Sequence, residues 1–239
     1  MTTEILNAII GGIFTLLATV VAILFSRWLD RKDRRKPPAD EKQARKDSPL
    51  RFDKRKWWEQ LDDNWKNIFK NAIYKKGMSR FLKITLGFKP SDSDLDKIFL
   101  LPKLNCACHE ISVLETLRPL TQLQVLICYN NNISDLEPLR PLTQLRHLDC
   151  HGNKISSLEP LRSLTQLHKL YCGNNQISRL EPIRPLIQLL ELYCGWNHIS
   201  DLEPLRSLVQ LQILYCSGNQ LSQLELDQFK EAVPNCKLL

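Results

Sequence analysis

The sequence predicts an α/β fold. This fold is a solenoid with a curved parallel β-sheet, short irregular or 3-10 segments on the convex side, a helical N-terminal cap and a separate transmembrane helix. Three observations predict it: an uncharged apolar run, an aromatic segment with helical periodicity, and a 22-residue unit that then repeats six times without insertion or deletion. The expected divisions are a transmembrane segment at 1–29, a basic flexible linker at 30–56, a helical cap at 57–100, six repeats at 101–224 and a C-terminal cap at 225–239.

The apolar run extends from Ile5 to Phe25, 21 residues without a charged side chain. As a helix it would be about 31 Å long, enough to cross a hydrocarbon core of roughly 30 Å. Helical structure is expected because a helix satisfies its own backbone hydrogen bonds in lipid. A cleaved signal peptide is the competing interpretation. It is disfavoured because the start, MTTE, has no positive side chain and no small-residue cleavage site follows the run.

The charges beside this run predict its orientation. No Lys or Arg precedes it, and six basic residues follow it: Arg27, Arg31, Lys32, Arg34, Arg35 and Lys36. The positive-inside rule therefore places the N-terminus outside the plasma (inner) membrane and the rest of the chain in the cytoplasm, as a single-pass protein. The six side chains are expected to bind anionic lipid headgroups, at about 1 kcal/mol for each charge.

The overall charge distribution favours a membrane over nucleic acid as the partner of these basic residues. Residues 1–100 contain 21 Lys and Arg against 13 Asp and Glu, whereas residues 101–239 contain 12 against 13. The excess therefore lies next to the apolar run and not on the repeats. No nucleic-acid partner is expected.

Small side chains form a stripe on the expected membrane helix, namely Gly11, Thr15, Ala18 and Ala22. Such a stripe allows two helices to approach closely, which predicts weak self-association. The alternative is that membrane helices simply contain many small residues.

A linker and a helical cap are expected between the membrane segment and the repeats. Residues 30–56 are charged and almost free of aliphatic side chains, so they cannot form a core. Apolar residues in 57–73 recur every three or four positions, which predicts one amphipathic helix. Ser91 and Asp92 before Leu95 predict the capped start of a second, shorter helix. Together these helices should cover the open end of the solenoid.

The repeated unit is LxxLxCxxNxIxxLxPLxxLxQ. Leu126 and Cys128 alternate with Ile127 and Tyr129, which is the pattern of a strand with one buried face. The asparagine that follows, Asn131 in this repeat, is expected to bond backbone groups inside the turn. The prolines prevent a long helix on the return segment. One such unit is too small to fold alone, so the units must stack and both ends need caps. Leu226, Phe229, Ala232 and Val233 predict a short closing helix, with a half-turn after it.

The unit LETLRPLTQLQVLICYNNNISD, residues 114–135, resembles the 22-residue class of bacterial leucine-rich repeats, the internalin-like group. The tryptophan-rich segment before the repeats also resembles that of bacterial leucine-rich-repeat proteins. The resemblance covers about 57–239, and it implies a curved parallel-sheet solenoid that binds protein on its concave face. Cysteine replaces the usual third leucine, and His109 replaces the first asparagine, which predicts a first repeat that merges into the cap. Internalins are exported, whereas the flanks here predict the opposite side of the membrane.

The sequence gives little support for catalysis or metal binding. Six of the eight cysteines lie on the 22-residue lattice at an inward position, which is typical of small core side chains. The cluster at 106–109 contains two cysteines and a histidine but lacks further ligands at zinc-site spacing. His147 and His151 would lie about 13 Å apart along a strand, too far to share a metal ion. No enzyme activity, cofactor or metal is expected.

The side chains that alternate with the core positions are the expected binding surface. They are rich in aromatic rings, which give a large contact area at low entropic cost. The expected partner-binding residues are Ile127, Tyr129, His147, Asp149, His151, Tyr171, Tyr193, Trp196 and Tyr215. The alternative is that tyrosine simply suits a strand ladder.

Together these features favour a membrane-anchored cytoplasmic adaptor or scaffold whose concave face binds another protein. Two alternatives stay open. One is a structural membrane protein whose juxtamembrane cluster binds lipid while the solenoid acts as a spacer. The other is a regulatory subunit of a bound enzyme.

Overall fold

A computed structural model describes residues 52–74 and 89–239 of the 239-residue chain. The chain divides into two units, residues 1–53 and 54–239, and the second contains all the elements described below. The expected transmembrane helix, its six basic neighbours and the small-residue stripe lie outside the described residues, as does nearly all of the expected linker. Within 52–74 and 89–239, no helix combines the length and the apolar character needed to cross a membrane.

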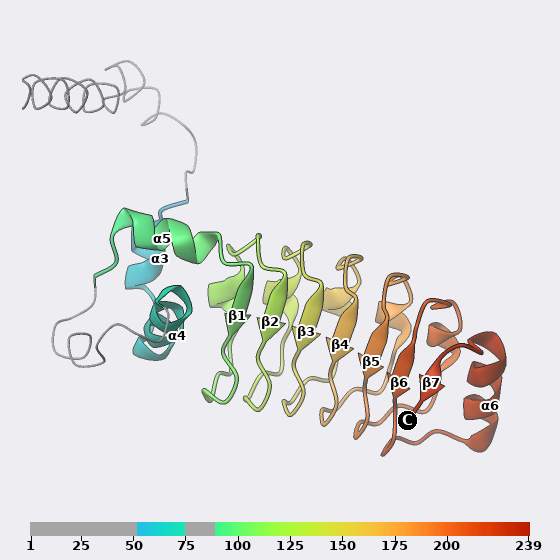
Figure 1. Cartoon of the computed structure of the whole chain (residues 1–239). Helices are drawn as coiled ribbons and strands as arrows, with labels where there is room; N and C mark the ends of the chain where they lie inside the picture. Colours follow the sequence, from blue (N-terminus) through green and yellow to red (C-terminus); the bar gives the residue numbers. More distant parts are fainter. Residues whose placement is uncertain (1–51, 75–88) are drawn as a thin grey trace, which may run out of the picture. The chain divides into compact units, whose positions relative to one another are not determined.

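The second unit is built on a parallel sheet whose strands follow one another in chain order (Figure 1). The seven strands are β1 Lys103–Asn105, β2 Val125–Ile127, β3 His147–Asp149, β4 Lys169–Tyr171, β5 Glu191–Tyr193, β6 Ile213–Tyr215 and β7 Lys237–Leu238. The sequence period sets the register, because Leu126 pairs with Leu148 and Leu148 with Leu170. The predicted parallel solenoid is confirmed. The seventh strand was not predicted, since only a closing half-turn was expected there.

Short 3-10 helices form the return segment of the solenoid. They are η1 Glu115–Leu117, η2 Glu137–Leu139, η3 Glu159–Leu161, η4 Glu181–Ile183 and η5 Glu203–Leu205. Four of them have proline at the first or second position, where a missing N–H costs nothing. In η2 the Arg140 Nε lies 2.7 Å from the Glu137 Oε1, and η1, η3 and η4 have the same pair. In each pair the charges of the glutamate and the arginine balance each other.

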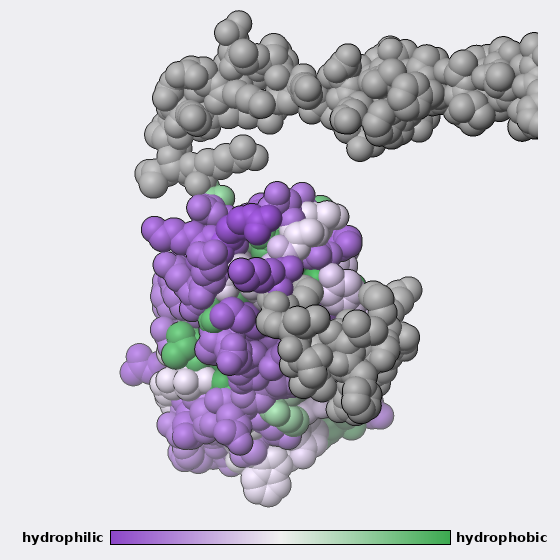
Figure 2. Space-filling view, turned by 90° about the vertical axis from the view of Figure 1, so that its left-hand side faces the viewer, coloured by the Kyte–Doolittle hydropathy of each residue, from purple (hydrophilic) through white to green (hydrophobic). Residues whose placement is uncertain are grey.

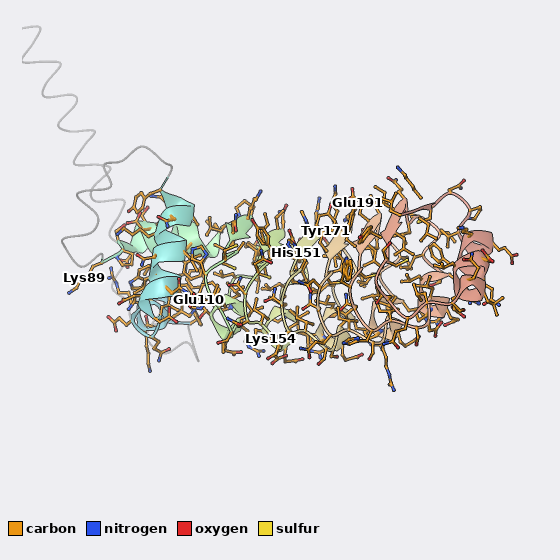
Figure 3. The ribbon with its side chains drawn as sticks, turned by 90° about the horizontal axis from the view of Figure 1, so that it is seen from below. Lys89, Glu110, His151, Lys154, Tyr171 and Glu191 are labelled. Carbon is orange, nitrogen blue, oxygen red and sulfur yellow. The ribbon has the colours of Figure 1, made fainter. Side chains whose placement is uncertain are left out.

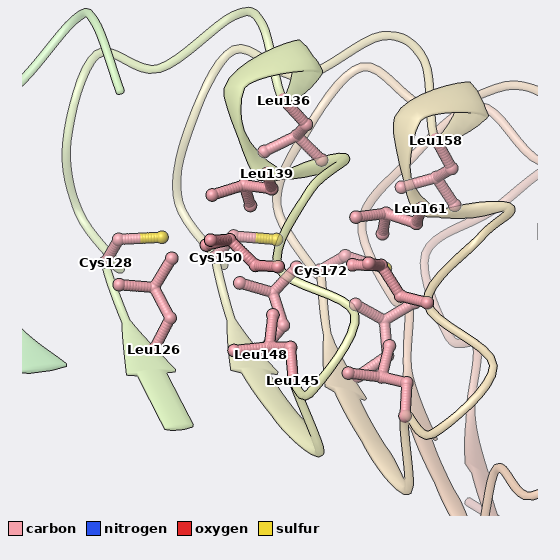
Figure 4. Close-up of a cluster of buried hydrophobic side chains, with 14 of the residues drawn as sticks. Leu126, Cys128, Leu136, Leu139, Leu145, Leu148, Cys150, Leu158, Leu161 and Cys172 are labelled. Atoms are coloured by element: carbon pink, nitrogen blue, oxygen red, sulfur yellow. The ribbon is translucent and has the colours of Figure 1, made fainter. Parts of the chain in front are cut away.

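The core consists of leucine and cysteine columns stacked from repeat to repeat (Figure 4). Leu126, Cys128, Leu148 and Cys150 are fully buried, and all eight cysteines of the described chain are free thiols. Burial raises the pKa of the Cys106 thiol to about 12, so it stays protonated. The prediction that the lattice cysteines are core side chains is confirmed.

The asparagine column satisfies the backbone where each strand turns toward the 3-10 helix. The Asn197 Nδ2 donates to the Cys172 oxygen at 3.1 Å and to the Cys194 oxygen at 3.0 Å, and its Oδ1 accepts from the Ile177 N–H at 2.9 Å. Equivalent bonds are made by Asn131, Asn153, Asn175 and Asn219. The predicted bonds to backbone groups in the turn are confirmed, and the structure adds that one side chain joins two successive turns.

Within residues 52–74 and 89–239, three helices precede the sheet: α3 Lys54–Glu59, α4 Asp63–Ile73 and α5 Asp92–Phe99. The single helix expected over 57–73 is wrong, because the chain breaks into α3 and α4. Asp62 causes the break, since its carboxylate accepts from the Trp65 N–H at 2.8 Å and starts a new helix. Helix α3 also begins at Lys54, inside the range expected to be linker. The predicted shorter helix is α5, where Ser91 and Asp94 form a capping box.

Aromatic packing holds the cap together at the start of the solenoid. The Phe69 ring is fully buried, with ring centroids 5.3 Å from Trp57 and 5.6 Å from Trp65. The Asn64 Nδ2 donates to the His109 oxygen at 2.7 Å, which links α4 to the first turn. His109 therefore merges the atypical first repeat with the cap, as predicted. The visible surface at this end is largely hydrophilic (Figure 2).

The other end of the solenoid is closed by α6 Gln223–Ala232 and by β7. Phe229 and Val233 are buried, and Leu226 and Ala232 pack against the core. The predicted C-terminal helix is confirmed. Both ends of the stack are thus covered, which leaves the outward face of the sheet as the surface to examine for binding.

Candidate partner-binding surface

The open face of the sheet, meaning the face directed away from the leucine core, carries a row of three tyrosines. Tyr171, Tyr193 and Tyr215 occupy the same register position on β4, β5 and β6. The Tyr171 and Tyr193 ring centroids are 4.7 Å apart at 66°, and those of Tyr193 and Tyr215 are 6.0 Å apart at 21°. The three residues form one continuous aromatic surface, which we call the tyrosine row.

A charged group fixes one end of the tyrosine row (Figure 3). The Tyr171 hydroxyl donates to the Glu191 Oε2 at 2.5 Å, while the Lys169 Nζ lies 2.6 Å from the Glu191 Oε1. The hydrogen bond from Lys169, followed by that from Tyr171, lowers the pKa of Glu191. Burial, followed by the bond to Glu191, raises the pKa of the Tyr171 phenol. The Tyr171 ring is therefore held rigidly before any partner arrives.

A second aromatic pair lies just after β2 and β3, toward the N-terminal end of the stack. The Tyr129 and His151 rings stack with centroids 4.7 Å apart at 11°, and the His151 Nδ1 lies 2.7 Å from the Asp149 Oδ1. Ile127 is half-buried beside Asp149 in the sheet register. Four of the predicted site residues thus form one patch. Among the described residues, no group of three or more potential metal ligands comes together.

His147 extends the tyrosine row by one ring onto β3. Its ring meets that of Tyr171 edge-on, with centroids 5.0 Å apart, and its Nε2 is buried without a hydrogen-bond partner in the described chain. Burial lowers the pKa of His147. The charged groups around it are Asp149 and Glu191, which oppose this effect, and Lys169 and Lys103, which add to it. The imidazole is therefore neutral at neutral pH.

This placement predicts a specific loss of stability on acidification. His147 in the unfolded chain titrates near 6.5 and the folded pKa is lower, so the unfolded state binds more protons between these values. The free energy of unfolding should fall as pH drops below about 6.5. The stabilisation from the Glu191 carboxylate is lost only as the pH falls below 4.5, the usual pKa of glutamate, because its folded pKa is lower. In urea titrations across this range, His147→Phe should show a shallower decline than the natural chain and no extra difference above pH 7. Parallel pH profiles for the variant and the natural chain would contradict the conclusion that His147 is buried and neutral.

Trp196 does not stand in the tyrosine row. It lies in the turn after β5 with φ +57 and is 65% exposed. Its ring packs against Gly218 of the next turn, where a Cβ would lie 2.8 Å from the Trp196 Cδ2. The structure therefore places Trp196 at the rim of the open face.

Two contributors to the surface were not selected from the sequence. Glu191 holds both Lys169 and Tyr171, and Gly195 provides space for the Tyr215 ring, since a Cβ there would lie 2.4 Å from the Tyr215 Cε1. One signal in the sequence could have indicated the role of Gly195, namely the change of residue type along its column of the 22-residue lattice. Tyr129 and His151 give way to glycine at the equivalent positions 173 and 195.

Comparison with known proteins shows what the repeats resemble. Residues 143–185 and 187–228 match the family described as leucine-rich repeats, two copies. The matched residues are thus similar to leucine-rich repeats, and the structural neighbours support the internalin-like class of solenoid.

Two solved structures illustrate the likeness. The internalin InlF of Listeria monocytogenes is 28% identical with a TM-score of 0.55, and the match covers 62% of this chain and 43% of that one. A leucine-rich-repeat protein of Leptospira interrogans is 25% identical with a TM-score of 0.57, over 64% of this chain and 40% of that one. The match thus spans less than half the length of either protein. A search of curated proteins found no match.

Proposed function

We propose that this chain is a protein-binding module, an adaptor or scaffold, whose open sheet face holds a partner protein. The observation that carries the proposal is the tyrosine row: three half-buried rings in register, each in contact with the next, one pair edge-on and one pair stacked. Rings that are already ordered lose little conformational entropy when a partner covers them. Leucine-rich repeats as a family are suited to this role, which favours binding over catalysis.

A strand ladder alone would not require the other features of this face. The Tyr193 and Tyr215 side chains make ring contacts to each other, but within the described residues their hydroxyls have no hydrogen-bond partner. Trp196, at the rim of the same face, is 65% exposed. Solvent-facing aromatic groups with free polar ends are typical of interface anchors.

Alanine replacement of Tyr171, Tyr193, Tyr215 and Trp196 tests this proposal. A partner captured from detergent-solubilised membranes is titrated against each purified variant by calorimetry. Interface anchors contribute about 2 kcal/mol or more each, so at least one single variant should bind roughly thirtyfold more weakly. The fourfold variant should not bind measurably.

The matched controls are Ile187→Ala and Val209→Ala, which truncate exposed apolar side chains outside the strands. Both should bind with unchanged affinity. Unchanged binding by a fourfold variant with a native circular-dichroism spectrum would remove the open face as the binding site.

We further propose that residues 1–29 anchor the module in the inner membrane as a single-pass helix, with the N-terminus outside and the repeats in the cytoplasm. The uncharged run and the six basic residues after it, Arg27 to Lys36, support this proposal. The basic residues would bind anionic headgroups, and the small-residue stripe would permit weak pairing of two helices.

Topology and lipid binding can be tested separately. Cys108 is exposed, so a membrane-impermeant thiol reagent should label it only after the cells are permeabilised. Labelling in intact cells would reverse the proposed orientation. For lipid binding, residues 27–239 should float with anionic vesicles, and glutamine at the six basic positions should abolish flotation. If flotation depends on these residues but no partner needs the tyrosine row, the chain is instead a lipid-binding structural protein.

A further inference from the structure

The lattice column that contains the Tyr129 and His151 rings continues as Gly173 and Gly195. The two rings stack with centroids 4.7 Å apart, which matches the spacing of neighbouring strands. They therefore follow one another across the sheet, and the second face of the His151 imidazole is directed toward Gly173 of the next repeat. The His151 side chain is 43% exposed, so a partner can reach it.

The position above Gly173 is not filled by any side chain of the residues that the structure describes. The three atoms nearest to a Cβ on this residue would all belong to the backbone of Gly195, at 3.1 to 3.9 Å. The backbone itself does not require glycine here, because Gly173 lacks the positive φ that Gly152 and Gly218 have. The stack of rings is therefore interrupted by open space above Gly173, and we call this space the open stacking position.

Aromatic rings border the open stacking position on its other sides. A Cβ on Gly195 would overlap the Tyr215 ring, so this ring covers Gly195 and lies opposite His151. Tyr171 stands two residues before Gly173 on the same face, and the bond from its hydroxyl holds it in place. The position is therefore enclosed by an imidazole and two phenol rings.

The size of the open stacking position suits one flat ring. His151 and Gly195 follow strands that are two places apart in the sheet, so about 9.5 Å separates the two sides. A ring inserted midway would lie about 4.7 Å from each side. Tyr129 and His151 already stack at this separation.

We infer that the open stacking position binds an aromatic side chain of the partner protein, namely Phe, Tyr or Trp. The inference rests on the proposed function and specifies the chemistry of the partner. The inserted ring would stack on the second face of His151, as Tyr129 already stacks on the first. Its edge would lie beside Tyr171 and Tyr215, an arrangement that aromatic pairs also favour.

Arginine is the other planar side chain that stacks on rings, but it fits this position less well. The carboxylates nearby are already paired. The Asp149 Oδ1 lies 2.7 Å from the His151 Nδ1. The Glu191 carboxylate accepts from both Lys169 and Tyr171. A guanidinium would have to share a carboxylate with one of these partners, whereas an uncharged ring needs no carboxylate.

The test is a selection from a random peptide display library on the immobilised full-length chain in detergent. Selected peptides should be enriched in Phe, Tyr or Trp. A selected peptide is then synthesised together with versions in which Leu or Arg replaces each aromatic residue in turn. All versions are titrated against the natural chain, against Gly173→Tyr, which fills the open stacking position, and against His151→Ala, which removes the ring beside it.

For the aromatic peptide, Gly173→Tyr should weaken binding about thirtyfold or more, because its own ring occupies the site of a partner anchor. His151→Ala should weaken binding roughly two- to tenfold, the usual contribution of one aromatic pair. At one position of the peptide, Leu should weaken binding to the natural chain and cancel the effect of His151→Ala, since no ring is left to stack.

The matched control is Gln176→Tyr, which adds the same ring to the same repeat. Gln176 is exposed and shares its lattice column with Lys154, which lies away from Tyr171 (Figure 3). This variant should bind every peptide as the natural chain does. Circular dichroism verifies that each variant is folded, and His151→Ala tests the stack even if Gly173→Tyr does not fold.

The outcomes separate this inference from the proposed function. If alanine at Tyr193 and Tyr215 abolishes binding while Gly173→Tyr and His151→Ala bind as before, the open face is the site but the inserted ring is wrong. If the selected peptides bind equally well to the alanine variants, the proposed function itself fails, and the inference fails with it. A selection without aromatic enrichment, or an Arg version that binds as tightly as the aromatic peptide, also overturns the inference.

Discussion

Replacing Asn197 with alanine is expected to lower the free energy of unfolding by about 3–5 kcal/mol, although the side chain is polar. The side chain is 5% exposed and bonds the oxygens of Cys172 and Cys194 and the N–H of Ile177. Alanine leaves the Ile177 N–H buried without a partner, which costs about 1–3 kcal/mol. It also removes one of the two amide bonds to each oxygen, at about 0.5–1.5 kcal/mol for each bond, while Asn175 still donates to the Cys172 oxygen and Asn219 to the Cys194 oxygen. Water can recover part of this loss where the turn opens, so the sum lies below the upper limit.

Asn132→Ala is the matched control for this experiment. Asn132 follows Asn131 in an equivalent turn, but its side chain is exposed, so the change should fall within about 0.5 kcal/mol of zero. Urea unfolding followed by circular dichroism measures both variants. Equal losses at the two positions would mean that the buried amide bonds do not link successive turns as described.

The sequence predicts the sheet well because one rule acts at every repeat. Leu148 must point inward, and the 22-residue interval then brings it beside Leu126 and Leu170. The cap follows no such rule. Apolar residues from Trp57 to Ile73 satisfy one helical period whether or not the chain breaks, and Asp62 suits either an exposed helix face or an N-cap. In the structure Asp62 is the N-cap of α4, and the break allows Trp57 and Trp65 both to pack on Phe69.

The sequence predicted which columns of the 22-residue lattice form the binding surface, but it did not predict the contacts that their side chains make. The tyrosine row follows from the lattice, whereas the bond from Tyr171 to Glu191 depends on side-chain rotamers of residues 20 positions apart. Trp196 illustrates the limit. Its column otherwise holds small or polar turn residues, such as Asn174 and Gly218, and its positive φ is unusual for a large side chain. The unusual residue type indicates that Trp196 has a distinct role. The sequence does not show that its ring lies at the rim and not in the tyrosine row.

Phe69→Ala should destabilise the chain by about 3–5 kcal/mol, the usual effect of emptying a fully buried aromatic site. Phe69 lies against Trp57 and Trp65, and its helix, α4, packs on β1. The control Asn71→Ala alters an exposed position of the same helix and should change stability by less than about 0.5 kcal/mol.

The position of this loss along the stack is more informative than its size. In a solenoid each repeat contacts only its neighbours, so loss of a cap exposes the first repeat before the last. Hydrogen exchange should therefore accelerate at Leu104 and Cys106 while the amides of β6 stay protected. Uniform acceleration across all repeats would mean that the stack unfolds as one unit, and the cap would then stabilise the tyrosine row as strongly as it stabilises β1.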